Sequence, residues 1–322
     1  MRRRGRAVRA SVAVFAEAGR ETTVTDRREE LLGFLAALGA FGVWGLAPLY
    51  FKLLGHVRAD EIIAHRVIWS LLFLALLLLL RDGRRALKRL HVSRRVLTAL
   101  AISGTLIAVN WLTFVYAVNT GRVLSTSLGY FINPLVNVVL GMIVFRETLG
   151  RLQSAAVVLA AVGTVYMTVR VGQFPWIALT LAGSFAAYSV VRKKTDVGPI
   201  VGLFWETLIL APLALVWLYG LAGRLQLEFD PADIAETALL IGTGLITLVP
   251  LVLFAAGVRR LRLSTIGIMQ YLAPSMTFCL AVFLFGEPFT VDHAITFGCI
   301  WTALVMFSWA GWSQARRARI PV

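Results

Sequence analysis

Two charged residues, Arg66 and Glu206, lie several positions inside long apolar stretches of the sequence. A charge in the hydrocarbon core of a bilayer costs free energy, so such residues usually face a polar interior and mark a functional pathway. Arg66 could hold an anionic or polar group, and Glu206, the one carboxylate well inside an apolar stretch, could hold a cation or a proton. The alternative is that both side chains reach the interface or bond neighbouring backbone carbonyls. On a simple helical rise their depths differ by about 10 Å, so they need not form a direct pair.

Neutral polar residues and prolines in the same stretches are further candidates. Asn110 and Asn133 must find hydrogen-bond partners away from lipid, either on other helices or on a solute. His65 is a second candidate for carrying a proton, or else a structural hydrogen-bonding residue. Pro134 and Pro274 each remove a backbone donor and free the carbonyl four residues earlier, which predicts either a hinge or a static kink.

Several aromatic rings lie within the apolar stretches rather than at their edges. Such rings could stack on an aromatic or amphipathic solute, and core packing is the alternative for each of them. The residues concerned are Trp44, Trp111, Tyr130, Trp205 and Tyr271.

All of these candidates must be positioned by helices that cross a membrane. Of the 322 residues, 58% are apolar and only 15% are charged, whereas soluble domains are about 25% charged. The apolar residues fall in blocks of about 20, the length of α-helix that crosses a hydrocarbon core. We therefore predict an all-α polytopic membrane protein with ten transmembrane helices, near 31–53, 61–80, 97–118, 123–145, 150–169, 174–191, 199–220, 232–257, 263–285 and 291–311.

The basic residues give these helices an orientation. With a cytoplasmic N-terminus, 26 of the 32 Lys and Arg residues fall in cytoplasmic segments and 4 in outer loops, as the positive-inside rule requires. We therefore expect a protein of the cell (inner) membrane with both termini in the cytoplasm, where 1–30 forms a basic, disordered tail and 312–322 a second basic tail. The net charge of +15 follows this loop pattern without an aromatic-interleaved basic face, so nucleic acid is not an expected partner.

Two parts of the chain, about 140 positions apart, resemble each other. Tyr130–Pro134 is matched by Gln270–Pro274, and Phe145-Arg146-Glu147 by Phe285-Gly286-Glu287. Each half, 31–170 and 174–311, holds five predicted helices, and this odd number gives the halves opposite orientations. Inverted repeats are typical of secondary transporters, whose solute site lies near the midplane between the halves. Glu147 and Glu287 are expected to stabilise the N-terminus of the helix that follows each of them.

The paired Phe-x-Glu helix ends in two five-helix halves resemble the EamA domains of the drug/metabolite transporter superfamily. Three segments, Trp44–Lys52, Glu61–Arg66 and Gly129–Leu135, are similar to the RarD group of permeases. The resemblance covers roughly residues 30–311. It implies a ten-helix inner-membrane carrier of the chloramphenicol-sensitivity or drug/metabolite type.

We therefore expect a secondary transporter that moves a small amphipathic metabolite or drug by alternating access, with proton-driven export as the coupling that the resemblance implies. The alternatives are a non-transporting membrane receptor or chaperone-like protein, a channel, and an intramembrane lipid-modifying enzyme. Enzymatic activity is not expected, because the sequence has no Gly-Lys dipeptide for a Walker A loop, no His-Glu-x-x-His and no Gly-x-Ser-x-Gly. The expected partners are the lipid bilayer, a small-molecule solute and protons, with no cofactor and no metal.

Overall fold

The computed structural model describes residues 2–83, 90–146, 150–171, 174–224, 227–229, 232–261, 265–266 and 269–317. Within this part of the chain the secondary structure is entirely helical. The first half holds α1 (Arg2–Leu53), α2 (Ala59–Asp82), α4 (Arg94–Asn119), α5 (Val123–Phe145) and α6 (Arg151–Val171). The second half holds α7 (Trp176–Lys194), α8 (Pro199–Gly223), α9 (Ile234–Val258), α11 (Leu272–Cys279), which continues as a π-helix over Leu280–Leu284, and α12 (Val291–Arg317).

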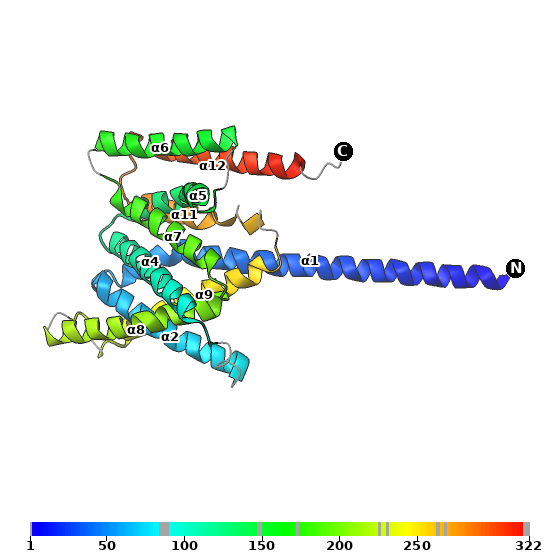
Figure 1. Cartoon of the computed structure of the whole chain (residues 1–322), viewed down its shortest axis with the longest axis horizontal. Coiled ribbons are helices and arrows are strands. Elements are labelled where there is room, and N and C mark those ends of the chain that lie inside the picture. Colours follow the sequence, from blue (N-terminus) through cyan, green and yellow to red (C-terminus); the bar gives the residue numbers. More distant parts are fainter. Residues whose placement is uncertain are drawn as a thin grey trace.

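These ten helices correspond one to one to the ten predicted spans, so the predicted fold class is confirmed. In the described residues, 8 helices are long and apolar enough to cross a membrane. The other two of the ten helices differ from these. The helix over Leu272–Leu284 is apolar but shorter, and α7 ends in the basic run Arg192–Lys194. The candidate span within α1 begins only at Arg28. The basic segment 1–30 therefore lies almost wholly before the membrane part of α1. This N-terminal part of the helix extends away from the bundle (Figure 1). The expected disorder of this segment stays a prediction.

The two prolines singled out in the sequence occupy different places. Pro134 lies in the interior of α5. Pro274 lies in the first turn of α11, which begins at Leu272 after a turn at 270–271. The start of this span, predicted near residue 263, lies outside the described residues. The first four N–H groups of a helix have no partner within it, so proline costs little there. The hinge role of Pro134 and Pro274 stays a prediction.

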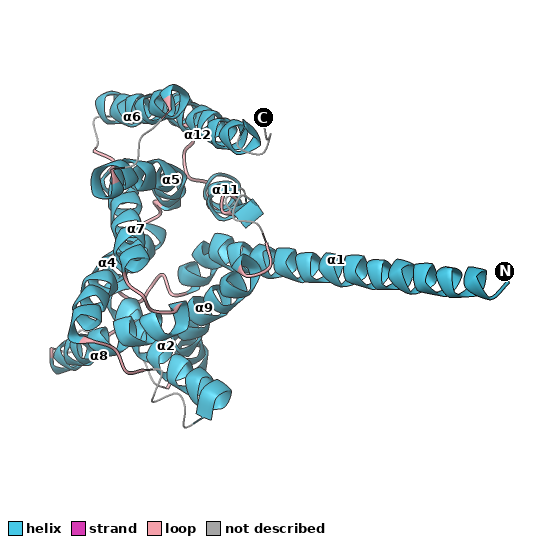
Figure 2. Ribbon diagram, turned by 45° about the vertical axis from the view of Figure 1, so that its right-hand side comes forward, coloured by secondary structure: helices cyan, strands magenta, loops and turns pink. Residues whose placement is uncertain are grey.

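The main contacts between helices are the same when each helix is replaced by its equivalent in the other half. The contact of α1 with α9 is matched by α7 with α4, that of α5 with α7 by α11 with α1, and that of α2 with α9 by α8 with α4. Three further contacts, α2 with α8, α5 with α11 and α6 with α12, join equivalent helices. Figure 2 shows α6 beside α12 at one end of the bundle and α2 near α8 at the other. This arrangement is what two inverted copies of one five-helix unit require.

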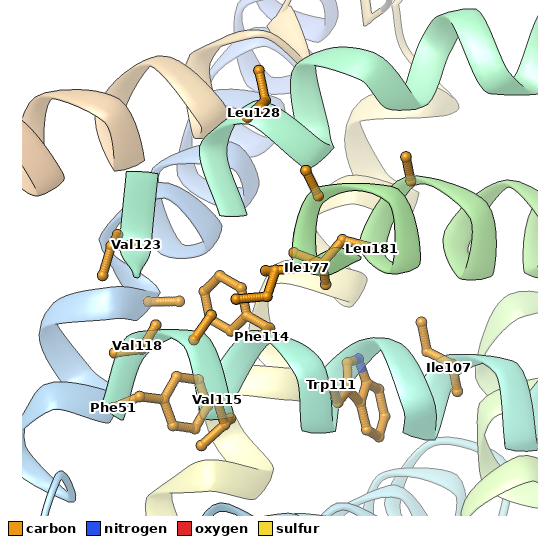
Figure 3. Packing of buried hydrophobic residues seen from close by; sticks show 14 of the residues in the cluster. Phe51, Ile107, Trp111, Phe114, Val115, Val118, Val123, Leu128, Ile177 and Leu181 are labelled. Atoms are coloured by element: carbon orange, nitrogen blue, oxygen red, sulfur yellow. The ribbon is translucent and has the colours of Figure 1, made fainter. Parts of the chain in front are cut away.

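Apolar side chains fill the junction of α1, α4, α5 and α7 (Figure 3). Phe51 meets Phe114 edge-on with 6.0 Å between ring centroids, and Leu128, Ile177 and Leu181 close the cluster from α5 and α7. Lipid tails are as apolar as these side chains, so close packing rather than escape from water stabilises such contacts.

Two glycines at equivalent positions allow other helices to pack closely against the two helices that carry Arg66 and Glu206. A Cβ added at Gly104 of α4 would lie 3.4 Å from the carbonyl oxygen of Glu206 on α8. A Cβ added at Gly244 of α9 would lie 2.7 Å from the carbonyl carbon of Trp69 and 2.9 Å from the nitrogen of Ser70, both on α2. The α2–α9 crossing is therefore the tighter of the two.

Candidate functional site

Arg66 lies on α2 among residues from three other helices. Its side chain is only 7% exposed. Its Nε donates a hydrogen bond of 2.7 Å to Oγ1 of Thr247 on α9. Its guanidinium carbon lies 4.1 Å from the ring centroid of Trp111, and 5.6 Å from that of Phe51. Stacking on an indole face attracts a cation, so Arg66 is held by one hydroxyl and an aromatic surface.

Glu206 occupies the equivalent position on α8 and has different neighbours. It is completely buried. Its Oε1 accepts a hydrogen bond of 2.6 Å from Oγ of Ser103 on α4 and lies 3.7 Å from Nε of Arg192 on α7. Its second oxygen, Oε2, has no hydrogen-bond partner in the described part of the chain. The carboxylate is thus paired with a cation, and Tyr188 also interacts with it.

Arg192 is a partner of Glu206 that sequence reasoning missed, because it was counted with the cytoplasmic basic run at the end of α7. A terminal nitrogen of its guanidinium donates to the backbone oxygens of Val197 at 3.5 Å and Gly198 at 3.4 Å. A Cβ on Gly202 would overlap another of its nitrogens. A glycine one helical turn before Glu206 was the signal in the sequence, since it leaves room for the arginine to reach the carboxylate.

Asn110 and Tyr130 form a second polar group close to Arg66. Nδ2 of Asn110 donates to the backbone oxygen of Leu181 at 3.0 Å and to Oγ of Ser184 at 3.0 Å. The hydroxyl of Tyr130 donates to Oδ1 of Asn110 at 3.3 Å, and Tyr130 lies within electrostatic range of Arg66. Asn110 therefore makes the interhelical bonds that were one of its two predicted roles, and contact with a solute stays a prediction.

The remaining predicted site residues are spread over the bundle. Trp44 packs against Phe41 and Phe254, and Tyr271 stacks on Phe131 with 6.5 Å between ring centroids. None of the contacts found in the described residues joins these rings to Arg66 or Glu206.

Two polar residues of the predicted site have local neighbours as well. Oδ1 of Asn133 accepts from Asn137 one turn later at 3.4 Å. The ring of His65 lies 5.1 Å from that of Phe229, and its Nε2 has no hydrogen-bond partner among the described residues. The structure thus brings together Arg66 with Trp111 and Asn110 with Tyr130, and leaves Trp44, Asn133, Tyr271 and His65 apart from them.

Glu287 ties one half of the protein to the other. It was expected to stabilise the helix that follows it, and this expectation is wrong for Glu287. Its carboxylate accepts the N–H groups of Val123 at 2.6 Å and Leu124 at 2.7 Å, which begin α5 in the opposite half. Burial raises the pKa of Glu287 above its ordinary value. Glu147, its equivalent in the repeat, lies outside the described residues.

Two hollows open on the outside of the bundle. One of about 510 Å³ lies along α6, and one of about 300 Å³ lies between α2, α4 and α8. Neither is lined by Arg66 or Glu206, so the wettable pocket between the halves stays a prediction. No cluster of three or more His, Cys, Asp or Glu suited to a metal ion occurs in the described part of the chain.

Comparison with known proteins places the chain in a family. The model of the EamA-like transporter family matches residues 31–169 and again 175–309. The chain is 44% identical over 282 residues to Protein RarD of Salmonella typhimurium, covering 88% of this chain and 96% of that protein. It is 43% identical over 302 residues to an uncharacterized transporter of Vibrio cholerae, covering 91% and 98%.

More distant relatives agree with this assignment. The Chloramphenicol-sensitive protein RarD of Pseudomonas aeruginosa is 31% identical over 291 residues, covering 89% of this chain and 96% of that protein. A solved crystal structure shares the fold with a TM-score of 0.57 at 18% identity, covering 85% of this chain and 96% of that chain. The chain is a multi-pass membrane protein that belongs to the EamA-like transporter family, with both of its halves matched and with RarD proteins among its relatives.

Proposed function

We propose that this chain is a secondary-active permease of the bacterial inner membrane that exports a small amphipathic metabolite or drug in exchange for protons, with both termini in the cytoplasm. One observation carries the proposal. Each half holds a buried charge at the same repeat position, Arg66 on α2 and Glu206 on α8, and these two helices contact each other. Buried charges are costly in a bilayer and are kept where they serve a solute or ion pathway.

The inverted arrangement suggests how the two charges act. The outer end of α2 and the inner end of α8 start from opposite faces, so Arg66 faces an opening toward the outside and Glu206 one toward the cytoplasm as one half rocks against the other. A proton on Glu206 would remove its charge and weaken its attraction to Arg192, which lies 3.7 Å away. Release of Arg192 would loosen α7 from α8 on the cytoplasmic side only.

The names of the relatives support a solute of the drug or metabolite class. One relative is named chloramphenicol-sensitive and another an uncharacterized transporter. A transport role needs no covalent chemistry, and we therefore propose that the chain is not an enzyme. Chloramphenicol is the first solute to test.

The test is flux of labelled chloramphenicol, and of a panel of small aromatic metabolites, into and out of proteoliposomes with an imposed pH gradient. Glu206→Gln should abolish the pH-driven flux while leaving the folded protein intact, because glutamine fills the same space and carries no exchangeable charge. Glu30→Gln, which changes an exposed carboxylate at the very start of the membrane part of α1, is the matched control and should leave the flux unchanged. Normal pH-driven flux in Glu206→Gln would show that this carboxylate does not carry the proton.

A further inference from the structure

The buried charges of the described residues differ in how they are compensated. Glu206 lies 3.7 Å from Arg192. The carboxylate of Glu61 accepts hydrogen bonds from the backbone N–H groups of Glu228 at 3.0 Å and Phe229 at 2.9 Å. Oε2 of Glu236 lies 3.2 Å from Nε2 of His56. Each of these acids is therefore met by donors or by a basic group.

Arg66 is different, because no carboxylate of the described residues forms an ion pair with it. Its hydrogen-bond and ring partners there are Thr247, Trp111 and Phe51, all of them neutral. An arginine stays protonated in proteins. A guanidinium that is only 7% exposed thus carries a positive charge with no negative counterpart among the residues that the structure describes.

We propose that the transported solute supplies this missing charge: it is an amphipathic organic anion whose carboxylate or phosphate group binds Arg66. This inference rests on the proposed transport function and names its solute class. An unpaired buried charge destabilises a protein strongly, and a ligand that neutralises it recovers that cost on binding.

The contacts of the guanidinium fit such a ligand. Its central carbon lies over the ring of Trp111 at 4.1 Å from the centroid, and Nε is fixed by Thr247. The terminal N–H groups of a guanidinium match the two oxygens of a carboxylate or phosphate. Because the side chain is fixed on two sides before the anion arrives, little further ordering is required.

The neighbouring aromatic rings fit the apolar body of the solute. The ring centroid of Phe51 lies 5.6 Å from the guanidinium carbon. The ring centroid of Phe114 lies 6.0 Å from that of Phe51 and 6.1 Å from that of Tyr130. The rings thus continue from Arg66 toward α5. These rings pack against one another in the core, so an aromatic anion would place its charge on Arg66 and its ring along this series once the two halves rock apart.

The first test needs no ligand and compares thermal unfolding of the full-length protein in lipid nanodiscs. Arg66→Met should unfold at the same or a higher temperature than the wild type, because it removes an uncompensated charge and keeps an unbranched side chain. Arg192→Met should unfold at a lower temperature, because it leaves Glu206 without its cation. If Arg66→Met is destabilised as much as Arg192→Met, Arg66 is already satisfied within the protein and the proposal fails.

The second test measures how three probes raise the unfolding temperature: benzoate, phenyl phosphate and the neutral benzamide. The wild type should bind at least one anion about tenfold more tightly than benzamide, as expected for a hydrogen bond to a charged group. Arg66→Met should lose this preference, Arg66→Lys should keep it in weakened form, and Lys52→Met, which removes an exposed cation, should leave it unchanged. Comparing benzoate with phenyl phosphate identifies the anionic group.

Two outcomes would overturn the proposal: no anion preference in the wild type, or a preference that survives in Arg66→Met. Failure of the transport function is a separate result. It would appear as anion binding that depends on Arg66 without pH-driven flux of any solute in proteoliposomes. Conversely, flux of neutral chloramphenicol that is unchanged in Arg66→Met, together with no anion preference, would retain the transporter and reject the anionic solute.

Discussion

The sites around Arg66 and Glu206 share one scaffold and differ in their chemistry. Each charge lies at the same place in its half, and each is bonded by a hydroxyl from an equivalent helix, Thr247 on α9 and Ser103 on α4. The first site is completed by aromatic rings and the second by Arg192. The repeat therefore fixes the backbone and the helix that supplies the hydroxyl, although Ser103 and Thr247 lie one helical turn apart in the repeat register. A few substitutions decide which charge each half presents.

One pair of equivalent residues explains why a second cation enters only one of the two sites. Lys52 at the end of α1 corresponds to Arg192 at the end of α7. Arg192 lies over Gly202, where no side chain is in its way. In the first half that position is Ile62, which is completely buried, and Lys52 instead donates to the backbone oxygen of Val118 at 3.3 Å. A glycine thus admits the arginine that an isoleucine would exclude.

The largest effect should come from separating Arg192 from Glu206. Gly202→Ile should displace the guanidinium, and Arg192→Gln should remove it. Either change should lower the free energy of unfolding by about 3 kcal/mol, the cost of leaving a buried charge unpaired. Lys52→Gln, at the equivalent exposed position, should change it little. Thermal and denaturant unfolding in nanodiscs measures all three variants, and equal losses for Arg192→Gln and Lys52→Gln would mean that the two halves are not different in this respect.

The next effect compares the two helix crossings. Gly244→Ala should be destabilising by about 2 kcal/mol, because a new methyl group would meet the backbone of Trp69 and Ser70 and backbone cannot move aside cheaply. Gly104→Ala should be tolerated, since its Cβ would be at ordinary contact distance from Glu206 and alanine favours helix. Unfolding temperatures of the two alanine variants test this. The reverse order would contradict the tighter α2–α9 crossing.

A smaller difference in the free energy of unfolding is expected between removal of the Thr247 hydroxyl and removal of the Ser103 hydroxyl. Thr247→Val keeps the shape of the side chain and removes the hydrogen bond to Arg66, so it should cost about 1.5 kcal/mol, as for other bonds to charged groups. Ser103→Ala removes the bond to Glu206, yet Arg192 remains beside the carboxylate. The loss for Ser103→Ala should therefore be smaller. A double-variant cycle with Arg66→Met or Glu206→Gln isolates each bond from other effects of the substitution.

The fold could be predicted almost completely from the sequence, because length, apolar blocks and basic loops are each read over many residues. Arg66 and Glu206 were found by the same logic, since a charge among apolar residues needs no partner to be noticed. Their partners could not be found in this way. Ser103 and Thr247 are common hydroxyls in apolar helices, and only the crossing of helices far apart in the chain makes them neighbours. Trp44 and Tyr271 pack against other rings, which was one of the two roles predicted for an aromatic ring within a span, and their contact with a solute stays a prediction.

The smallest effect concerns the contact between Glu287 and the start of α5, which holds the two halves together away from both charges. Burial raises the pKa of Glu287 above its ordinary 4.5, so the folded protein favours the protonated form. The stability gained from this group is therefore full below about pH 4.5 and is lost as the pH rises through the raised pKa. Glu287→Gln should flatten this part of the pH dependence of the unfolding temperature, whereas Glu228→Gln, an exposed control, should not. An unchanged slope in Glu287→Gln would assign it to another group.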